Sequence, residues 1–188
     1  MGLFVGPSDG TRAKRITPVW LGEVQYPAWS PDGKWIAFQL SSAGASGFDL
    51  YKIRPTGHSL TRLTRDGMSG AYNEWPMWSP DSGWIAYGVE GEQSALWVMR
   101  ADGSAKRRVR SGIGVPASWA PGSWLVANCG MCICAVPLTG GSLIPLLHGR
   151  EAGFPAWRPR QRLSQLRRRG LADDPQLMSG TGLPSGCP

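Results

Sequence analysis

The sequence predicts an all-β protein made of repeated units of four antiparallel strands. One segment recurs along the 188 residues, and each recurrence is followed by further short apolar stretches. Gly and Pro account for 26 and 16 residues, more than average usage, and they interrupt nearly every window long enough for a helix. Ten tryptophans indicate a packed chain, because disordered chains carry few large apolar side chains.

The recurring segment predicts the first two strands of each unit. Around Trp29 it reads W-S-P-D-G-K-W-I-A-F, and it returns around Trp78 as W-S-P-D-S-G-W-I-A-Y. A weaker copy, W-A-P-G-S-W-L-V-A, begins at Trp119, and a fourth begins at Trp157 and then loses the pattern. Aromatic and β-branched stretches indicate strands on both sides of a turn, in which Pro fixes φ at the second position and Asp tolerates the third.

A second element predicts strands three and four. It reads L-Y-K-I, then T-G, then R-L-T within residues 50–64, and it returns within residues 96–109 and 133–146. A further version within residues 3–17 precedes the first copy of the recurring segment. The Asp-Gly pairs between the two strands are typical of hairpin turns.

Repeated four-stranded units of about 40 residues are typical of β-propeller blades. We therefore expect about four blades, forming an incomplete or open propeller. The expected divisions are a partial blade over 1–17, blades over 26–66, 75–110 and 115–147, and one first strand over 154–159, all within a propeller of residues 1–159. Residues 160–188 are expected to form a disordered, basic, Gly/Pro-rich tail. The repeated aromatics Trp29, Trp35, Phe38 and Tyr51 are predicted to pack between blades.

These motifs resemble the TolB-type propeller repeat, which also builds the propellers of prolyl-oligopeptidase-like and tricorn-type peptidases. The resemblance covers residues 3–159. It implies a propeller fold and, through TolB proteins, the periplasm and the Tol–Pal envelope system, where the propeller contacts a peptidoglycan-associated lipoprotein. The third turn, Ala120-Pro121-Gly122, departs from the pattern by lacking Asp, and the pattern ends after Pro159. These departures favour a truncated or frame-altered end.

Charge and hydropathy exclude some partners. The net charge is +7, of which residues 1–157 carry +3 and residues 158–188 carry +4. A nucleic-acid partner is not predicted, because the basic residues gather in the tail and not on the expected folded part. No apolar stretch is long enough for a membrane span. Residues 1–7 have neither the basic region nor the apolar run of a signal peptide, so the sequence by itself leaves the compartment open.

Enzymatic residues are not predicted. The chain contains two histidines, His58 and His148, and no G-x-S-x-G motif of an α/β-hydrolase. We therefore expect a non-enzymatic scaffold without cofactor or metal. The alternative is a fragment of the gating propeller of a prolyl-oligopeptidase-like or tricorn-like serine peptidase.

Three cysteines, Cys129, Cys132 and Cys134, gather where other units have the hairpin between strands two and three. Plain buried thiols are the first interpretation. A local disulfide and half of a zinc site are the alternatives, the latter because two thiolates of a C-x-x-C turn can converge on one ion.

Loops that lead into each first strand are the predicted binding surface for a protein or peptide. Such loops join consecutive blades and open near the central channel. The predicted binding residues are Glu23, Gln25, Tyr72, Asn73, Glu74, Arg150 and Glu151. The carboxylates of Glu23, Glu74 and Glu151 recur at similar depth, so they could hold a cation or a basic peptide; the alternative is that they are solvated loop acids. Exposed blade faces would also favour self-association.

Overall fold

A computed structural model describes residues 2–91, 94–113, 115–120, 123–130 and 132–148. Within these residues the chain forms β-strands and one short 3-10 helix, η1, at Gly67–Ser69. No helix in the described ranges is both long and apolar enough to cross a membrane. The expected tail and the first strand at 154–159 lie outside the described residues.

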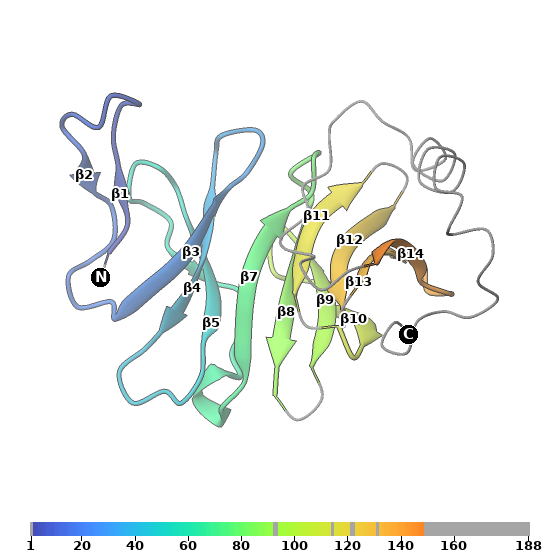
Figure 1. Cartoon of the computed structure of the whole chain (residues 1–188). Helices are drawn as coiled ribbons and strands as arrows, with labels where there is room; N and C mark the ends of the chain where they lie inside the picture. Colours follow the sequence, from blue (N-terminus) through green and yellow to red (C-terminus); the bar gives the residue numbers. More distant parts are fainter. Residues whose placement is uncertain (1, 92–93, 114, 121–122, 131, 149–188) are drawn as a thin grey trace.

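The strands form four antiparallel sheets (Figure 1). The N-terminal sheet has two strands, β1 (Phe4–Val5) and β2 (Lys14–Arg15). The next sheet contains β3 (Glu23–Trp29), β4 (Ile36–Ser41), β5 (Asp49–Ile53) and β6 (Thr61–Arg62). The third contains β7 (Tyr72–Trp78), β8 (Trp84–Glu90), β9 (Ala95–Arg100) and β10 (Arg107–Ser111). The fourth contains β11 (Pro116–Ala120), β12 (Trp124–Cys129), β13 (Cys132–Pro137) and β14 (Ile144–His148).

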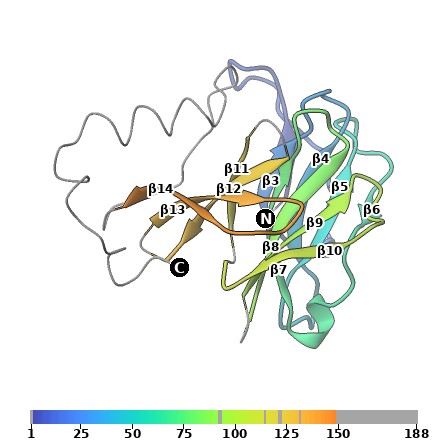
Figure 2. The ribbon, with the colours of Figure 1, turned by 90° about the vertical axis from the view of Figure 1, so that its right-hand side faces the viewer.

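Each four-stranded sheet follows chain order, so each is a blade of the predicted kind. The first strands are neighbours: β3 contacts β7, and β7 contacts β11. Figure 1 shows the sheets arranged in a row from β1–β2 to β11–β14, and Figure 2 shows the same row turned by 90°. The described residues thus form an incomplete propeller, as predicted, without closing a ring.

The first strands β3 and β7 begin earlier than predicted. Glu23, Gln25, Tyr72, Asn73 and Glu74 were expected in loops, but they lie within these strands. Both strands continue through an aromatic-Pro pair because a register shift interrupts the pairing there, between Gln25 and Ala28 and between Glu74 and Met77. A bulge suits proline, whose nitrogen has no hydrogen to donate to a neighbouring strand.

Apolar side chains fill the space between consecutive sheets. Between the second and third sheets, Leu50 and Leu63 meet Ile85, Tyr87 and Met99, all of which are buried. Between the third and fourth sheets a similar cluster joins Leu96 and Val98 to Leu125 and Val136. One blade cannot bury both of its faces, so each sheet depends on its neighbour for stability.

The Ser-Pro-Asp turns hold their shape through their own side chains. Asp32 Oδ1 accepts hydrogen bonds from Ser30 Oγ at 2.6 Å and from the Lys34 N–H at 3.1 Å. The Ser30 hydroxyl in turn accepts the Trp35 N–H at 2.9 Å. Ser79 and Asp81 repeat this arrangement in the next blade. These contacts explain why Ser and Asp stand two residues apart in both copies.

Tryptophan indoles connect the blades at their first strands. The indole N–H of Trp78 donates to the Ala28 carbonyl at 3.0 Å, and that of Trp119 donates to the Met77 carbonyl at 3.0 Å. Ala28 and Met77 are the residues directly before Trp29 and Trp78. The same hydrogen bond therefore recurs from one blade to the next.

The prediction of interblade packing is confirmed for Phe38, which is buried, and for Tyr51 and Trp35, which pack in the clusters on either side of the β3–β6 sheet. It is wrong for Trp29, which is 51% exposed. Trp29 begins the series of tryptophans, and the sheet before it contains only β1 and β2. No first strand therefore lies beside Trp29 within the described residues.

Cys129 and Cys134 form a disulfide across the β12–β13 hairpin, with their Cα atoms 6.1 Å apart. The interpretation of plain thiols is therefore wrong for this pair, and the local disulfide is the alternative that holds. The register explains it: Cys129 lies opposite Cys132, which places Cys134 diagonally across from Cys129. Among the described residues, no group of three or more His, Cys, Asp or Glu side chains is arranged to hold a metal ion.

We expect Trp78→Phe to lower the free energy of unfolding by about 2 kcal/mol, because it leaves the Ala28 carbonyl without its donor and removes part of a buried ring. Urea unfolding followed by far-UV circular dichroism measures the change. Trp20→Phe is the matched control, since Trp20 is 77% exposed, and it should change stability by less than about 0.5 kcal/mol. Equal effects of the two substitutions would contradict the role of the indole contact.

Candidate functional site

Two aromatic rings from consecutive blades meet at the first strands. The centroids of the Tyr26 and Trp75 rings are 3.8 Å apart, with their planes inclined by 36°. Tyr26 is 43% exposed, and Trp75 is half-buried. Each ring stands directly before the proline of its repeat. The pair therefore forms an aromatic surface at the contact between β3 and β7.

The backbone of both aromatic residues is in the left-handed region. Tyr26 has φ 48° and Trp75 has φ 55°. A bulky non-glycine residue rarely adopts this conformation, which costs of order 1–3 kcal/mol when it does. The surrounding strands hold it because the bulges in β3 and β7 fall at these positions. Such strain at two equivalent positions, of which Tyr26 is exposed and Trp75 half-buried, marks this surface as a candidate site.

A chain of hydrogen bonds links three of the side chains involved. Gln25 Nε2 donates to Glu23 Oε1 at 2.7 Å, and Gln39 Nε2 donates to Gln25 Oε1 at 3.4 Å. Gln39, which is buried, accepts the Trp75 N–H at 3.2 Å through its Oε1. The chain thus runs from the exposed Glu23 carboxylate in one blade to the strained Trp75 in the next.

The carboxyl of Glu74 lies in a partly desolvated environment beside Trp75. Burial, and after it the nearby Glu90 carboxylate, raises the pKa of Glu74 above its ordinary value of 4.5, while a hydrogen bond from Trp75 acts in the opposite direction. Keeping this carboxylate charged without a partner costs free energy. Binding of a cation beside it is therefore favoured. Glu23, Gln25, Tyr26, Glu74 and Trp75 together are called the first-strand surface below.

Not every predicted binding residue belongs to this surface. Asn73 is 1% exposed, and its Nδ2 donates to the Phe48 carbonyl at 3.0 Å and to Asp66 Oδ1 at 2.8 Å. It therefore connects β7 to the preceding blade, and its part in binding stays a prediction. Tyr72 is 40% exposed, with its ring 5.7 Å from that of Phe48. Arg150 and Glu151 lie outside the described residues.

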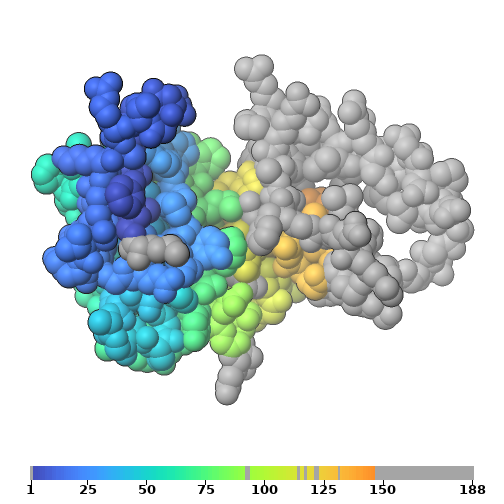
Figure 3. Space-filling view, turned by 60° about the vertical axis from the view of Figure 1, so that its left-hand side comes forward, coloured from blue at the N-terminus to red at the C-terminus, as the bar shows by residue number. Residues whose placement is uncertain are grey.

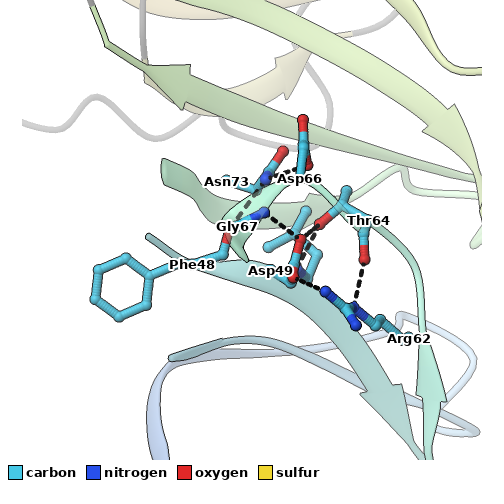
Figure 4. Close-up of polar contacts among 8 residues, drawn as sticks. Phe48, Asp49, Arg62, Thr64, Asp66, Gly67 and Asn73 are labelled. Atoms are coloured by element: carbon cyan, nitrogen blue, oxygen red, sulfur yellow. Dashed lines mark hydrogen bonds and ion pairs between the residues drawn. The ribbon is translucent and has the colours of Figure 1, made fainter. Parts of the chain in front are cut away.

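A polar network next to Asn73 braces the connection between β6 and β7 (Figure 4). Asp49 is buried, and its carboxylate accepts hydrogen bonds from Arg62, from Thr64 Oγ1 at 2.9 Å and from the Gly67 N–H at 3.1 Å. Thr64 Oγ1 also accepts the Leu50 N–H at 2.8 Å. The network satisfies the buried carboxylate and positions residues 64–67 against β5.

Sequence reasoning named Glu23, Gln25 and Glu74, and the structure brings all three to the β3–β7 contact. It did not single out Tyr26 and Trp75, whose rings meet at this contact. The usable signal was present, because an aromatic residue stands directly before the proline in these two copies and at Phe154 in the fourth. An aromatic at a position that a bulge leaves unpaired can point away from the core.

Comparison with solved structures supports the fold. The chain is similar to a structure from Agrobacterium tumefaciens that carries the name TolB, with 24% identity, a TM-score of 0.63, and coverage of 78% of this chain and 56% of that one. For TolB from Acinetobacter baumannii the identity is 21%, the TM-score 0.62 and the coverage 77% and 37%. For a puromycin-hydrolyzing peptidase from Mycobacterium tuberculosis the values are 19%, 0.60, 78% and 27%.

The predicted resemblance to TolB-like and peptidase propellers is therefore confirmed as a likeness of fold, and the chain spans little more than half of the first of these structures. No protein-family model matches the sequence, and no curated protein does.

We expect Glu74→Gln to stabilise the protein at neutral pH. A raised pKa means that the folded state binds the proton more tightly than the unfolded state, so charging Glu74 costs stability as the pH rises through and above 4.5. The gain from Gln should therefore vanish well below pH 4.5, where Glu74 is protonated in both states. Urea unfolding across this range measures it, with Glu23→Gln as the exposed control. A gain that persists unchanged in acid would contradict the assignment.

Proposed function

We propose that this protein is a non-enzymatic, TolB-like propeller scaffold that binds a protein or peptide through its first-strand surface. The observation that carries the proposal is the Tyr26–Trp75 pair, which is held in strained backbone beside carboxylates, with Tyr26 exposed and Trp75 half-buried. Strained backbone is typical of functional sites. Tyrosine and tryptophan are enriched among the few interface residues that contribute most of the binding energy.

The charges of the surface favour a basic ligand segment. Glu23 is exposed, and the nearby Glu90 carboxylate disfavours the charge of Glu74. A lysine or arginine of a ligand would relieve this repulsion, and its side chain could lie on the faces of Tyr26 and Trp75. The ligand we propose is therefore a peptide segment that combines basic with apolar or aromatic residues.

The compartment that we propose is the periplasm, with a role in the cell envelope of the Tol–Pal kind. The likeness of fold to TolB supports this role. The Cys129–Cys134 disulfide supports an oxidising compartment, because disulfides persist there and are rare in the cytosol.

The alternative function is that of a propeller within a larger serine peptidase. The likeness to the puromycin-hydrolyzing peptidase favours it, and this chain spans 27% of that structure. Such a function requires an α/β-hydrolase segment with a G-x-S-x-G motif encoded in the same gene. Sequencing the native locus distinguishes the two functions, since finding that segment would overturn the scaffold proposal.

A titration with a short peptide that alternates lysine and phenylalanine tests the first-strand surface, with a peptide that alternates glutamate and phenylalanine as the control. We expect the basic peptide to quench tryptophan fluorescence and to bind about tenfold more weakly to Tyr26→Ala and to Glu74→Gln. Met68→Ala is the matched control, because Met68 is exposed and lies outside the surface. Equal binding of both peptides, or no effect of Tyr26→Ala, would contradict the proposal.

A second kind of partner that we propose is another copy of this chain, at the end of the arc that carries Trp29. Trp29 presents the indole that its equivalents Trp78 and Trp119 use to contact the preceding blade. The large exposed apolar residues Phe4, Val19 and Trp20 come from β1 and the β2–β3 connection, which lies on the side of the β3–β6 sheet away from β7 (Figure 3). A blade of another copy that continues the series would bury Trp29.

We expect multi-angle light scattering of the full chain to give a mass above the 20.3 kDa of one chain at high protein concentration, and Trp29→Ser to shift it toward the monomer. Trp20→Ser, also exposed, tests whether a general loss of apolar surface is enough. A monomeric wild-type protein at every concentration would refute self-association through this end.

A further inference from the structure

A pocket of about 420 Å³ lies between the β3–β6 and β7–β10 sheets, apart from the first-strand surface. Its buried lining comes from Thr64, Asn73 and Tyr87. Val89 and Trp97 form an apolar wall on the β7–β10 sheet. The register places Asn73 opposite Val89 and Tyr87 opposite Trp97, so these four side chains share one face of that sheet.

Tyr87 is the buried aromatic residue of the pocket. The residue is 2% exposed, and its ring is stacked 6.4 Å from that of Trp97. Its hydroxyl makes no hydrogen bond within the described residues, where Asn128 Oδ1 is the one fully enclosed side-chain atom without a partner. The Tyr87 hydroxyl is therefore not sealed in the core and faces the pocket that the residue lines. Because this hydroxyl has no hydrogen bond to the described residues, it is available to hydrogen-bond a ligand in the pocket.

Burial, and after it the charge of Asp66, raises the pKa of Tyr87 above its ordinary value of 10.0. The hydroxyl therefore keeps its proton at neutral pH, so it can donate one hydrogen bond and accept others.

Charged groups of both signs stand at the opening of the pocket. Arg65 forms no ion pair among the described residues, and its guanidinium is exposed. The Lys106 ammonium donates to the Gly103 carbonyl at 2.8 Å, which leaves two of its three hydrogens for other acceptors. Asp66 uses Oδ1 to accept the Asn73 amide, and its second carboxylate oxygen has no hydrogen bond within the described part of the chain.

We propose that this pocket binds a small zwitterion, namely a free α-amino acid with an apolar side chain. The ligand carboxylate pairs with Arg65 and Lys106, and its ammonium pairs with Asp66. The Tyr87 hydroxyl hydrogen-bonds the polar end of the ligand, and the ligand side chain lies against Val89 and Trp97. The volume lies within the range of small-molecule pockets, which are mostly apolar with a few placed polar groups.

Both charges of the ligand are needed by this arrangement. A simple anion would leave its carboxylate close to Asp66, and a simple cation would lie close to Arg65 and Lys106; in each case like charges repel. A zwitterion matches each charge of the pocket with its opposite. Water alone would pair the Tyr87 hydroxyl but would leave the apolar wall of Trp97 and Val89 without a partner.

Isothermal titration calorimetry of the full chain with L-leucine tests the proposal. Two analogues provide the ligand controls: leucinamide lacks the carboxylate, and N-acetylleucine lacks the ammonium. We expect L-leucine to bind and each analogue to bind at least about tenfold more weakly, because each leaves a charged group of the pocket unpaired. Binding of N-acetylleucine as tight as that of L-leucine would show an anion site only and would overturn the proposal, as would the absence of binding heat with L-leucine.

Variants separate binding from folding. Tyr87→Phe keeps the ring against Trp97 and removes only the hydroxyl, so it should weaken L-leucine binding about tenfold without lowering the melting temperature. Arg65→Gln should weaken L-leucine binding but leave the weak binding of leucinamide unchanged, whereas Arg12→Gln, an exposed control outside the pocket, should change neither. Unaltered binding in Tyr87→Phe would overturn the proposal. Tyr26→Ala should not affect L-leucine binding, so this result stands or falls separately from the peptide-binding function.

Discussion

The structure depends on the hydrogen bond that a first-strand tryptophan donates to the blade before it. Trp78 and Trp119 each reach the carbonyl of the residue preceding the equivalent tryptophan, so the contact repeats at both junctions between the three described four-stranded sheets. It brings β3, β7 and β11 side by side, and the apolar clusters between the sheets form around this spacing. Because the sheets are stable only in contact, a directional bond at every junction sets how they stack.

The candidate peptide surface is a consequence of the same junction. A first strand must pass an aromatic-Pro pair before it reaches its tryptophan, and it does so through a bulge with left-handed backbone at Tyr26 and Trp75. The bulge turns these rings toward each other across the β3–β7 contact. The packing of the blades thus holds Tyr26 and Trp75 in a strained backbone conformation, and these two residues form the aromatic surface.

One side of the pocket is formed by a segment that is held in place by a feature of its own blade. Asp49 stands where the next blade has Ala95, and its carboxylate holds Arg62, Thr64 and Gly67. This network fixes the segment that carries Arg65 and Asp66 over one face of the β7–β10 sheet. Asp49 does not line the pocket itself but holds the segment that supplies Thr64, Arg65 and Asp66 to it.

The sequence by itself determined the repeat, the four strands of each blade, their turns and the incomplete ring, because hydrophobic alternation and turn chemistry act over a few residues. It also pointed to Glu23, Gln25 and Glu74. Only the tertiary structure decided that Tyr26 meets Trp75, that Asn73 is buried, that Trp29 is exposed, that Cys129 pairs with Cys134 and that Tyr87 faces a pocket. These facts depend on contacts between strands and between blades, and the register and the stacking that create such contacts exist only after the sheets assemble.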